Sequence, residues 1–237
     1  MIRNVLPSGI LNQDTVMILV NAIYFKGKWS VQFKPEETKK TTFYANKNIQ
    51  KQVNMMNGVR NALAGYNYEL RCKVLKLPYS GDELSMIFFL PDSIDGLAQL
   101  ENKIDASVFK KLLGSVYLQD SYISIPKFDI KSSYDLKSIL SNLGMSEIFD
   151  QSKADFGAMI KPPPKVYINY ARQDAIVEVT EEGTRAAAVT VFKVGASSGS
   201  AFDERVPFIF NANHPFRFFI VDNMSNIILF MGRYTNP

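Results

Sequence analysis

The sequence has very few of the side chains on which most metal sites and covalent cross-links depend. Among 237 residues there is one cysteine, Cys72, and one histidine, His214. A single cysteine cannot form an intramolecular disulfide, and one cysteine with one histidine cannot complete a structural zinc site. Disulfide-stabilised scaffolds and the common zinc sites are therefore excluded, and no metal or other cofactor is expected.

Long apolar runs and an excess of charge of one sign are also missing. The most apolar run, residues 16–25, is too short to span a bilayer and lies too far from the start for a signal peptide. No targeting segment is visible, and no membrane partner is expected. Lysine and arginine number 27 against 23 aspartate and glutamate, a net charge of +4, and the basic residues are scattered. This distribution does not indicate a nucleic-acid-binding surface.

The apolar residues that are present suffice for a large core, because 46% of the chain is hydrophobic and 12% is aromatic. Helical periodicity appears at 97–113 and 133–145. Strands are predicted at residues 16–25, 41–43, 53–56, 73–78, 84–90, 121–130, 166–179, 217–221 and 227–231. The first of these is apolar on both faces, as in a central strand, and the runs at 73–78 and 84–90 predict a hairpin. Strands with interspersed helices and no repeat indicate the α+β class with mixed β-sheets.

One short motif raises the question of catalysis. Ser197 lies between Gly195 and Gly199 in the pattern G-x-S-x-G, the nucleophile elbow of hydrolases. That motif requires a helix after the serine and an acid and a histidine further on, but small residues follow here and His214 is the only histidine. We therefore predict no hydrolase and no other enzyme. Cys72 is predicted to be a small buried hydrophobe, and His214 a structural histidine.

The residues just before this motif have a different pattern. From Thr184 to Thr190 small residues alternate, so that one face of an extended chain would be uniformly small, while Arg185 points the other way. Such a segment could join a sheet interior without overpacking it or burying a charge. Gly183 supplies a hinge, and the run continues the predicted strand at 166–179. A flexible, alanine-rich surface loop is the alternative interpretation.

Four blocks of sequence resemble the serpin family, the serine protease inhibitors, over essentially the whole chain. The blocks are residues 19–29 (LVNAIYFKGKW); 125–128 with 134–136, 143–145 and 154–156; 178–188; and 214–216 with 229–233. The resemblance implies one serpin domain over residues 1–237, an α+β fold with serpin-like mixed sheets. It also implies that this fold is incomplete at the N-terminus, without the N-terminal helices and two main-sheet strands.

The resemblance further implies an inhibitor of serine endopeptidases that acts by suicide cleavage of a reactive loop, residues 181–206, and insertion of the cleaved loop into the main sheet. The expected hinge consists of Glu181, Glu182, Gly183, Thr184, Ala186, Ala187, Ala188 and Thr190. The residues expected to control sheet opening, at the positions called breach and shutter, are Trp29, Asn21, Lys127 and Gln173.

The family spacing places the scissile bond at Ser197-Ser198, which suits an elastase-like protease. Ala201-Phe202 and Arg205-Val206 remain alternatives, the latter for a trypsin-like protease. Gln173 stands where the family usually has a histidine, and it could hydrogen-bond Asn21.

Three further expectations follow. The strand at 16–25, with one cover missing, would expose an apolar surface and favour self-association. A non-inhibitory or truncated regulatory serpin is the alternative function. We expect an extracellular rather than a cytoplasmic location, with Asn223 of the sequon 223–225 as the glycosylation candidate.

Overall fold

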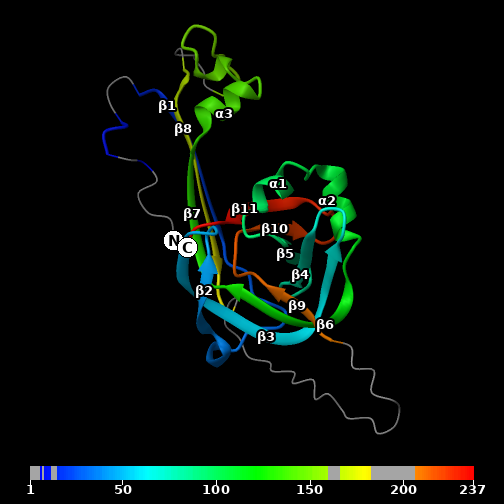
Figure 1. Cartoon of the computed structure of the whole chain (residues 1–237). Coiled ribbons are helices and arrows are strands. Elements are labelled where there is room, and N and C mark those ends of the chain that lie inside the picture. Colours follow the sequence, from blue (N-terminus) through cyan, green and yellow to red (C-terminus); the bar gives the residue numbers. More distant parts are fainter. Residues whose placement is uncertain (1–5, 7, 12–14, 160–165, 183–205) are drawn as a thin grey trace. The chain divides into compact units, whose positions relative to one another are not determined.

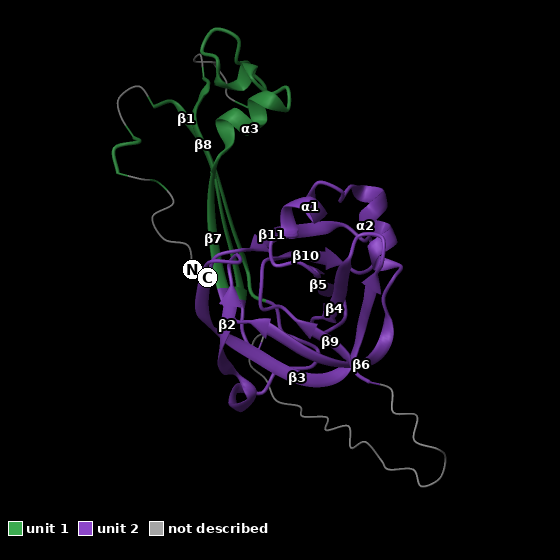
Figure 2. Ribbon diagram, in the orientation of Figure 1, with its two compact units in different colours: residues 1–26, 129–178 green, residues 27–128, 179–237 purple. Residues whose placement is uncertain are grey.

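The computed structural model describes residues 6, 8–11, 15–159, 166–182 and 206–237. The chain forms two compact units, which Figure 1 shows with their elements and Figure 2 separates by colour. Unit 1 contains residues 1–26 and 129–178, and unit 2 contains residues 27–128 and 179–237. The chain therefore crosses between the units three times.

Unit 1 is built on a three-stranded sheet in the order β1-β8-β7. Its elements are β1 (Met17–Phe25), β7 (Phe128–Asp135), α3 (Leu136–Asn142), the 3₁₀ turn η2 (Glu147–Phe149) and β8 (Ile168–Val179). β1 and β8 run parallel and pair along the whole of β1. Helix α3 begins where the Asp135 carboxylate accepts the N–H of Lys137 at 3.0 Å, and the chain leaves it at Gly144 with φ +94°.

Unit 2 is built on an eight-stranded sheet in the order β11-β10-β5-β4-β3-β6-β9, with β2 paired to β3. Its elements are η1 (Pro35–Glu37), β2 (Lys39–Tyr44), β3 (Gln50–Asn67), β4 (Cys72–Pro78), β5 (Leu84–Pro91), α1 (Leu97–Glu101), α2 (Ala106–Leu113), β6 (Tyr117–Pro126), β9 (Phe208–Asn211), β10 (Phe216–Asp222) and β11 (Ile228–Tyr234).

Strands β4, β5 and β10 of unit 2 are buried on both faces. On one face Phe89 of β5 and Phe219 of β10 pack with Phe109 of α2, with ring centroids 4.9–5.7 Å apart. On the other face the neighbouring Phe88 and Phe216 are in contact at 5.8 Å. Two covered faces explain why the sequence of β5 is continuously apolar rather than alternating.

The predicted hairpin at 73–78 and 84–90 is confirmed, since β4 and β5 pair antiparallel. The single helix predicted over 97–113 is wrong, because Asp105 caps a new helix by accepting the N–H of Val108 at 2.8 Å. The helix predicted over 133–145 is shorter, since residues 133–135 belong to β7.

The strand predicted at 121–130 divides into β6 and β7, which belong to different sheets. The four-residue strand β9 was not predicted, because so short a run carries no periodicity.

β1 is an edge strand, not the central strand that its composition predicts. Among the described residues nothing pairs with its second edge, and on its faces Leu19, Val20 and Tyr24 are 39–44% exposed. The expectation of an exposed apolar surface on this strand is thus confirmed.

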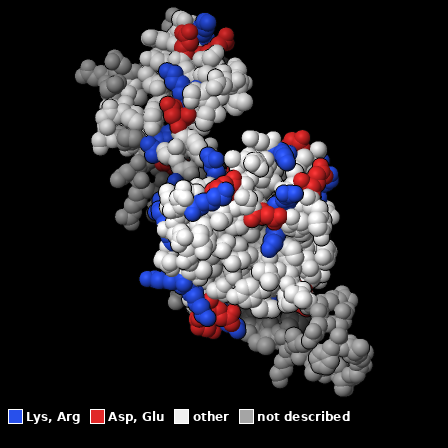
Figure 3. All heavy atoms as spheres, viewed as in Figure 1, with Lys and Arg blue, Asp and Glu red and all other residues white. Residues whose placement is uncertain are grey.

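The described surface carries charges of both signs, interleaved on the face in Figure 3 around an uncharged expanse over unit 2. Among the helices that the structure describes, none is long and apolar enough to cross a membrane.

Candidate functional site

The candidate site lies where the chain leaves β8, at Thr180 and Glu181, immediately before the predicted hinge. Both residues belong to unit 2. The carbonyl of Thr180 accepts the indole N–H of Trp29 at 2.9 Å, and the carbonyl of Glu181 accepts the N–H of Phe33 at 3.1 Å. The beginning of the predicted loop is therefore held by hydrogen bonds from a segment about 150 residues earlier.

Trp29 is held rigidly by aromatic neighbours. Its ring stacks on Tyr79 with centroids 4.6 Å apart and planes 8° from parallel, and Phe33 contacts it edge-on at 6.4 Å. Trp29 and Tyr79 also form an isolated antiparallel bridge. Because a buried indole is stable only when its N–H has a partner, the packing of the ring fixes the position of Thr180.

Glu181 is a buried acid with two side-chain partners. Its carboxylate lies 2.8 Å from the ammonium of Lys127 and accepts the hydroxyl of Thr38 at 3.0 Å. Burial by itself raises the pKa of Glu181, but the hydrogen bonds from Lys127, its own backbone and Thr38 outweigh burial, so its pKa lies below the ordinary value. A buried charge is tolerated only when it is paired in this way, which makes Glu181 an anchor.

Of these residues, Trp29, Lys127 and Glu181 were predicted from the sequence, and the structure brings them together. Phe33, Thr38 and Tyr79 were missed. Tyr79 lies in the predicted turn of the β4–β5 hairpin. Its neighbours Ser80, Gly81 and Asp82 are typical turn residues, whereas a tyrosine is not, and this unusual residue type could have pointed to Tyr79. Phe33 and Thr38 flank a short 3₁₀ turn that has no periodic pattern.

Asn21 and Gln173 belong to unit 1 and are register partners on β1 and β8. Register partners place their side chains on the same face of a sheet, and the hydrogen bond between these two stays a prediction. At the end of the same strand pair, the Glu178 carboxylate accepts the Tyr24 hydroxyl at 2.6 Å and pairs with Lys26. These contacts hold the pKa of Glu178 below its usual range, first through Lys26.

Most of the predicted loop lies outside the described residues. This holds for Gly183, Thr184, Ala186, Ala187, Ala188, Thr190, Ser197, Ser198, Ala201, Phe202 and Arg205. Glu182 is described and exposed, and so is Val206, whose exposed fraction is 83%.

Cys72 and His214, the two residues weighed for a catalytic role that the structure describes, are both buried. Cys72 is fully buried, and desolvation raises the pKa of its thiol to about 12. His214 is buried, and its Nε2 lies 2.6 Å from the carbonyl oxygen of Pro91, so it is structural, as predicted. In the described part of the chain, no three acidic, histidine or cysteine side chains are grouped as a metal would require.

The glycosylation candidate Asn223 lies in the turn between β10 and β11. Its amide nitrogen, the atom that a glycan would take, donates to the carbonyl of Asp82 at 2.6 Å. Its side-chain oxygen is buried without a partner. Glycosylation at this residue stays a prediction.

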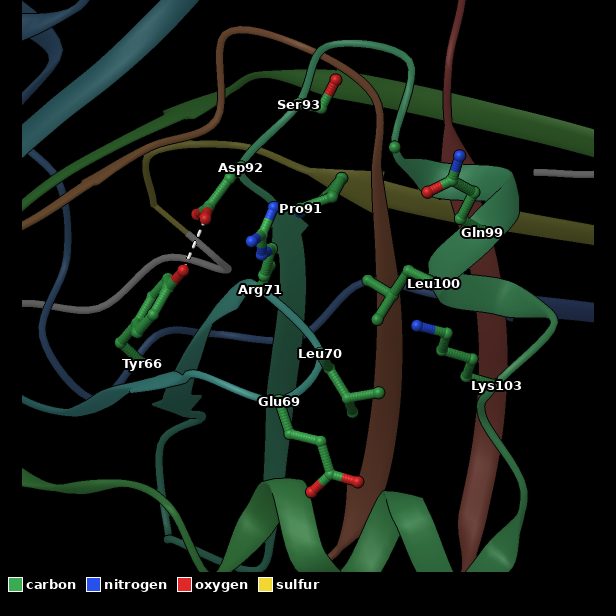
Figure 4. Close-up of a pocket in the computed structure, with 11 residues that line it drawn as sticks. Tyr66, Glu69, Leu70, Arg71, Pro91, Asp92, Ser93, Gln99, Leu100 and Lys103 are labelled. Carbon is green, nitrogen blue, oxygen red and sulfur yellow. Dashed lines mark hydrogen bonds between the residues drawn. The ribbon is translucent and has the colours of Figure 1, made fainter.

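Figure 4 shows a pocket of about 600 Å³ in unit 2, between the β3–β4 turn and helix α1. Arg71 and Lys103 share its wall with Glu69 and Asp92, and Tyr66 donates to Asp92. The charges of opposite sign partly cancel, and no predicted site residue lines this pocket.

Comparison with known proteins decides the family. Residues 1–237 match the sequence model of the family described as serpin (serine protease inhibitor). The chain belongs to the serpin family. This serpin is 39% identical to Serpin B3 of Homo sapiens and 41% identical to the leukocyte elastase inhibitor of Xenopus tropicalis, and each match covers 100% of this chain. The matches cover 60% and 62% of the relatives, so this serpin spans about three fifths of their length.

The fold agrees with solved serpin structures. Uncleaved ovalbumin superposes with a TM-score of 0.86 at 29% identity, covering 100% of this chain and 58% of ovalbumin. The predicted α+β class with serpin-like mixed sheets is therefore confirmed.

Proposed function

We propose that this serpin contains two functional parts of a serine protease inhibitor: the loop that the protease cleaves and the sheet into which the cleaved loop inserts. The loop at 181–206 is offered as a substrate. The serine hydroxyl of the protease attacks a loop carbonyl, the peptide C–N bond breaks, and the new amine leaves with a proton. The acyl-enzyme persists because the cleaved loop enters the main sheet before water hydrolyses the ester. Strand addition of this kind is an established property of serpin loops.

The direct parallel pairing of β1 with β8 carries this proposal. A segment that turns back after Glu181 runs antiparallel to β8, and therefore antiparallel to β1 as well. Its insertion replaces one parallel ladder by two antiparallel ladders. Antiparallel pairing is slightly more stable per residue, and each new pair adds backbone hydrogen bonds, so insertion is downhill once the loop is cut.

The anchor at Thr180 and Glu181 supports the same proposal from the side of the loop. The anchor fixes the point at which the loop must turn back along β8. Its contacts with Trp29 and Lys127 are a hydrogen bond and an ion pair, so they can break reversibly when the loop moves. The small residues from Thr184 to Thr190 then suit the interior of the sheet.

The target is proposed to be a serine protease that accepts small residues, with Ser197-Ser198 as the scissile bond. A relative named leukocyte elastase inhibitor supports an elastase-like target. Cleavage at Arg205-Val206 would instead indicate a trypsin-like target. Incubating the chain with elastase-like and trypsin-like proteases and mapping the cut by mass spectrometry distinguishes the two.

Insertion is tested by replacing Thr184 with arginine. Because Thr184→Arg would bury a charge in the sheet, we expect insertion to slow and the variant to be cleaved without trapping the protease. The wild type should give a detergent-resistant complex and a higher melting temperature after cleavage. Arg185→Lys, which points away from the small face, is the matched control. Equal trapping by the Thr184 variant would refute insertion.

A second candidate is a non-inhibitory, binding serpin, which is favoured because no described strand pairs with the second edge of β1 in the receiving sheet. In that case loop cleavage would leave the melting temperature unchanged in the wild type.

A further inference from the structure

A single asparagine–glycine pair occurs in the sequence, at Asn57-Gly58 in the middle of β3. Every other asparagine is followed by a residue that has a side chain. Glycine has no Cβ, so its backbone is free to move and its nitrogen is accessible to the preceding side chain. An asparagine before glycine therefore loses its amide group to water more easily than other asparagines do. The sequence thus makes Asn57 the first candidate for deamidation.

Deamidation takes place in two steps and needs no reactant other than water. The backbone nitrogen of Gly58 attacks the side-chain carbon Cγ of Asn57, the carbon–nitrogen bond of the amide breaks, and ammonia leaves with the proton from the Gly58 nitrogen. Water then adds to one carbonyl carbon of the cyclic imide, and the ring bond from that carbon to nitrogen breaks as the nitrogen takes up a proton. The product is an aspartate or an isoaspartate at position 57.

In the folded chain three hydrogen bonds hold the side chain of Asn57. Its Nδ2 donates to the carbonyl of Glu37 at 2.8 Å and to the carbonyl of Met55 at 3.0 Å. Its Oδ1 accepts the hydroxyl of Ser124, a buried residue of β6, at 2.6 Å. The backbone around it is fixed as well, because residues 55–64 of β3 pair with β6. Since the amide carbon must turn towards the Gly58 nitrogen to react, deamidation is suppressed until this part of unit 2 opens.

Asn57 also holds the segment that contributes to the anchor. Glu37 is the last residue of η1, and the next residue, Thr38, donates its hydroxyl to the Glu181 carboxylate at 3.0 Å. An aspartate at position 57 has no amide hydrogens, so it cannot donate to the carbonyls of Glu37 and Met55, and its negative charge repels both oxygens. The segment that carries Thr38 then loses its attachment to β3, and the contact between Thr38 and Glu181 weakens with it.

We propose that Asn57 is a deamidation site that reacts only when its contacts with η1 and β6 open, and that its conversion to aspartate or isoaspartate weakens the hold of Thr38 on Glu181. Because the loss of ammonia is irreversible, each reaction leaves the anchor permanently looser. The fraction of deamidated chains therefore records how often this region has opened. The proposal concerns the anchor as the structure describes it and does not depend on the proposed function.

Mass spectrometry of peptides from the incubated chain tests the site and its protection. The wild type is kept at mildly alkaline pH, folded or unfolded in guanidinium chloride, and the internal reference is Asn61, which is exposed on the same strand. In the unfolded chain Asn57 should react about tenfold faster than Asn61. Folding should slow the reaction of Asn57 at least about tenfold. Equal rates in either comparison would overturn the proposal.

The role of the hydrogen bonds is tested by Ser124→Ala, which removes the donor to Asn57 Oδ1 and leaves the sequence around Asn57 unchanged. Deamidation of the folded variant should be about fivefold faster than that of the wild type, as expected for the loss of one hydrogen bond. Ser121→Ala is the matched control, because Ser121 is also buried on β6 but donates to the carbonyl of Gln119. Equal rates in the two variants would show that the contacts of Asn57 do not protect it.

The effect on the anchor is tested by Asn57→Asp and by wild type measured before and after deamidation. In both cases the urea midpoint followed by Trp29 fluorescence should fall. Thr38→Val removes the hydroxyl that Glu181 accepts, so the double variant Asn57→Asp with Thr38→Val should lose less stability than the sum of the two single losses. Additive losses, or an unchanged midpoint after deamidation, would refute the link between Asn57 and the anchor.

Discussion

At the scale of single residues, the anchor depends on a buried carboxylate whose partner is half-exposed. The side chain of Glu181 is 10% exposed, whereas that of Lys127 is 42% exposed. Solvent screens the ammonium, so the pair is worth less than a fully buried one, but removing Lys127 leaves the acid without its cationic partner.

We expect Lys127→Met to lower the free energy of unfolding of unit 2 by about 1–3 kcal/mol. The double variant Lys127→Met with Glu181→Gln should recover part of the loss, because a neutral amide needs no counter-ion. Urea unfolding followed by Trp29 fluorescence measures this locally, since Trp29 is the only tryptophan and contacts the anchor. If the two single substitutions simply add, the ion pair does not stabilise the anchor.

His214 gives the chain a pH dependence of known sign. Burial lowers the pKa of His214, although its contact with Pro91 raises the pKa in part. Below the unfolded value of about 6.5 the unfolded chain therefore binds a proton that the folded chain does not. Stability should fall as the pH decreases from about 6.5 towards the folded pKa, by at most about 1.4 kcal/mol per pH unit.

Urea midpoints between pH 5.5 and 7.5 test this expectation. The control is His214→Gln, which keeps a hydrogen-bond donor but does not titrate. An identical slope in wild type and variant would assign the pH dependence to other groups.

At the scale of elements, strands that are long and strongly apolar could be predicted from the sequence, and β4, β5, β8 and β10 are where the pattern places them. The boundaries of helices and strands that depend on one or two residues could not be predicted in this way. Asp105 restarts a helix in the middle of a continuous helical period, and Pro126 and Lys127 divide one apparent strand between two sheets. In both places a local hydrogen bond or a change of sheet overrides periodicity.

The candidate site could be predicted only in part, because some of its residues lie in segments without a recognisable pattern. Trp29, Lys127 and Glu181 stand in blocks that resemble a family, whereas Thr38 contributes one hydroxyl from an irregular segment. Nothing in local sequence indicates that this hydroxyl faces an acid 143 residues later.

β1 is the strand through which the chain is most expected to self-associate. No other strand in the described part of the chain pairs with its second edge, and Val20 exposes apolar surface on this strand. We expect the isolated chain to associate through this strand, as light scattering at increasing concentration would show. Val20→Lys should reduce association, because a lysine on an edge strand opposes pairing. Val31→Lys, at a similarly exposed valine of unit 2, is the control. A monodisperse wild-type monomer would contradict this expectation.

At the scale of the whole molecule, neither unit is a continuous stretch of chain. Unit 1 combines residues 1–26 with 129–178, and unit 2 is interrupted in the same way. The strand pair β1–β8 thus depends on contacts between residues about 150 positions apart. Such long-range pairing must form late and slowly, because a large loop has to be closed before any contact stabilises it.

The buried Cys72 has a practical consequence. A thiol with a pKa of about 12 and no solvent exposure is almost inert towards alkylating reagents at neutral pH. It becomes reactive only when the strands around it separate. Since the chain has no other cysteine, the rate at which iodoacetamide adds one mass increment counts the opening events of unit 2 without any engineered label.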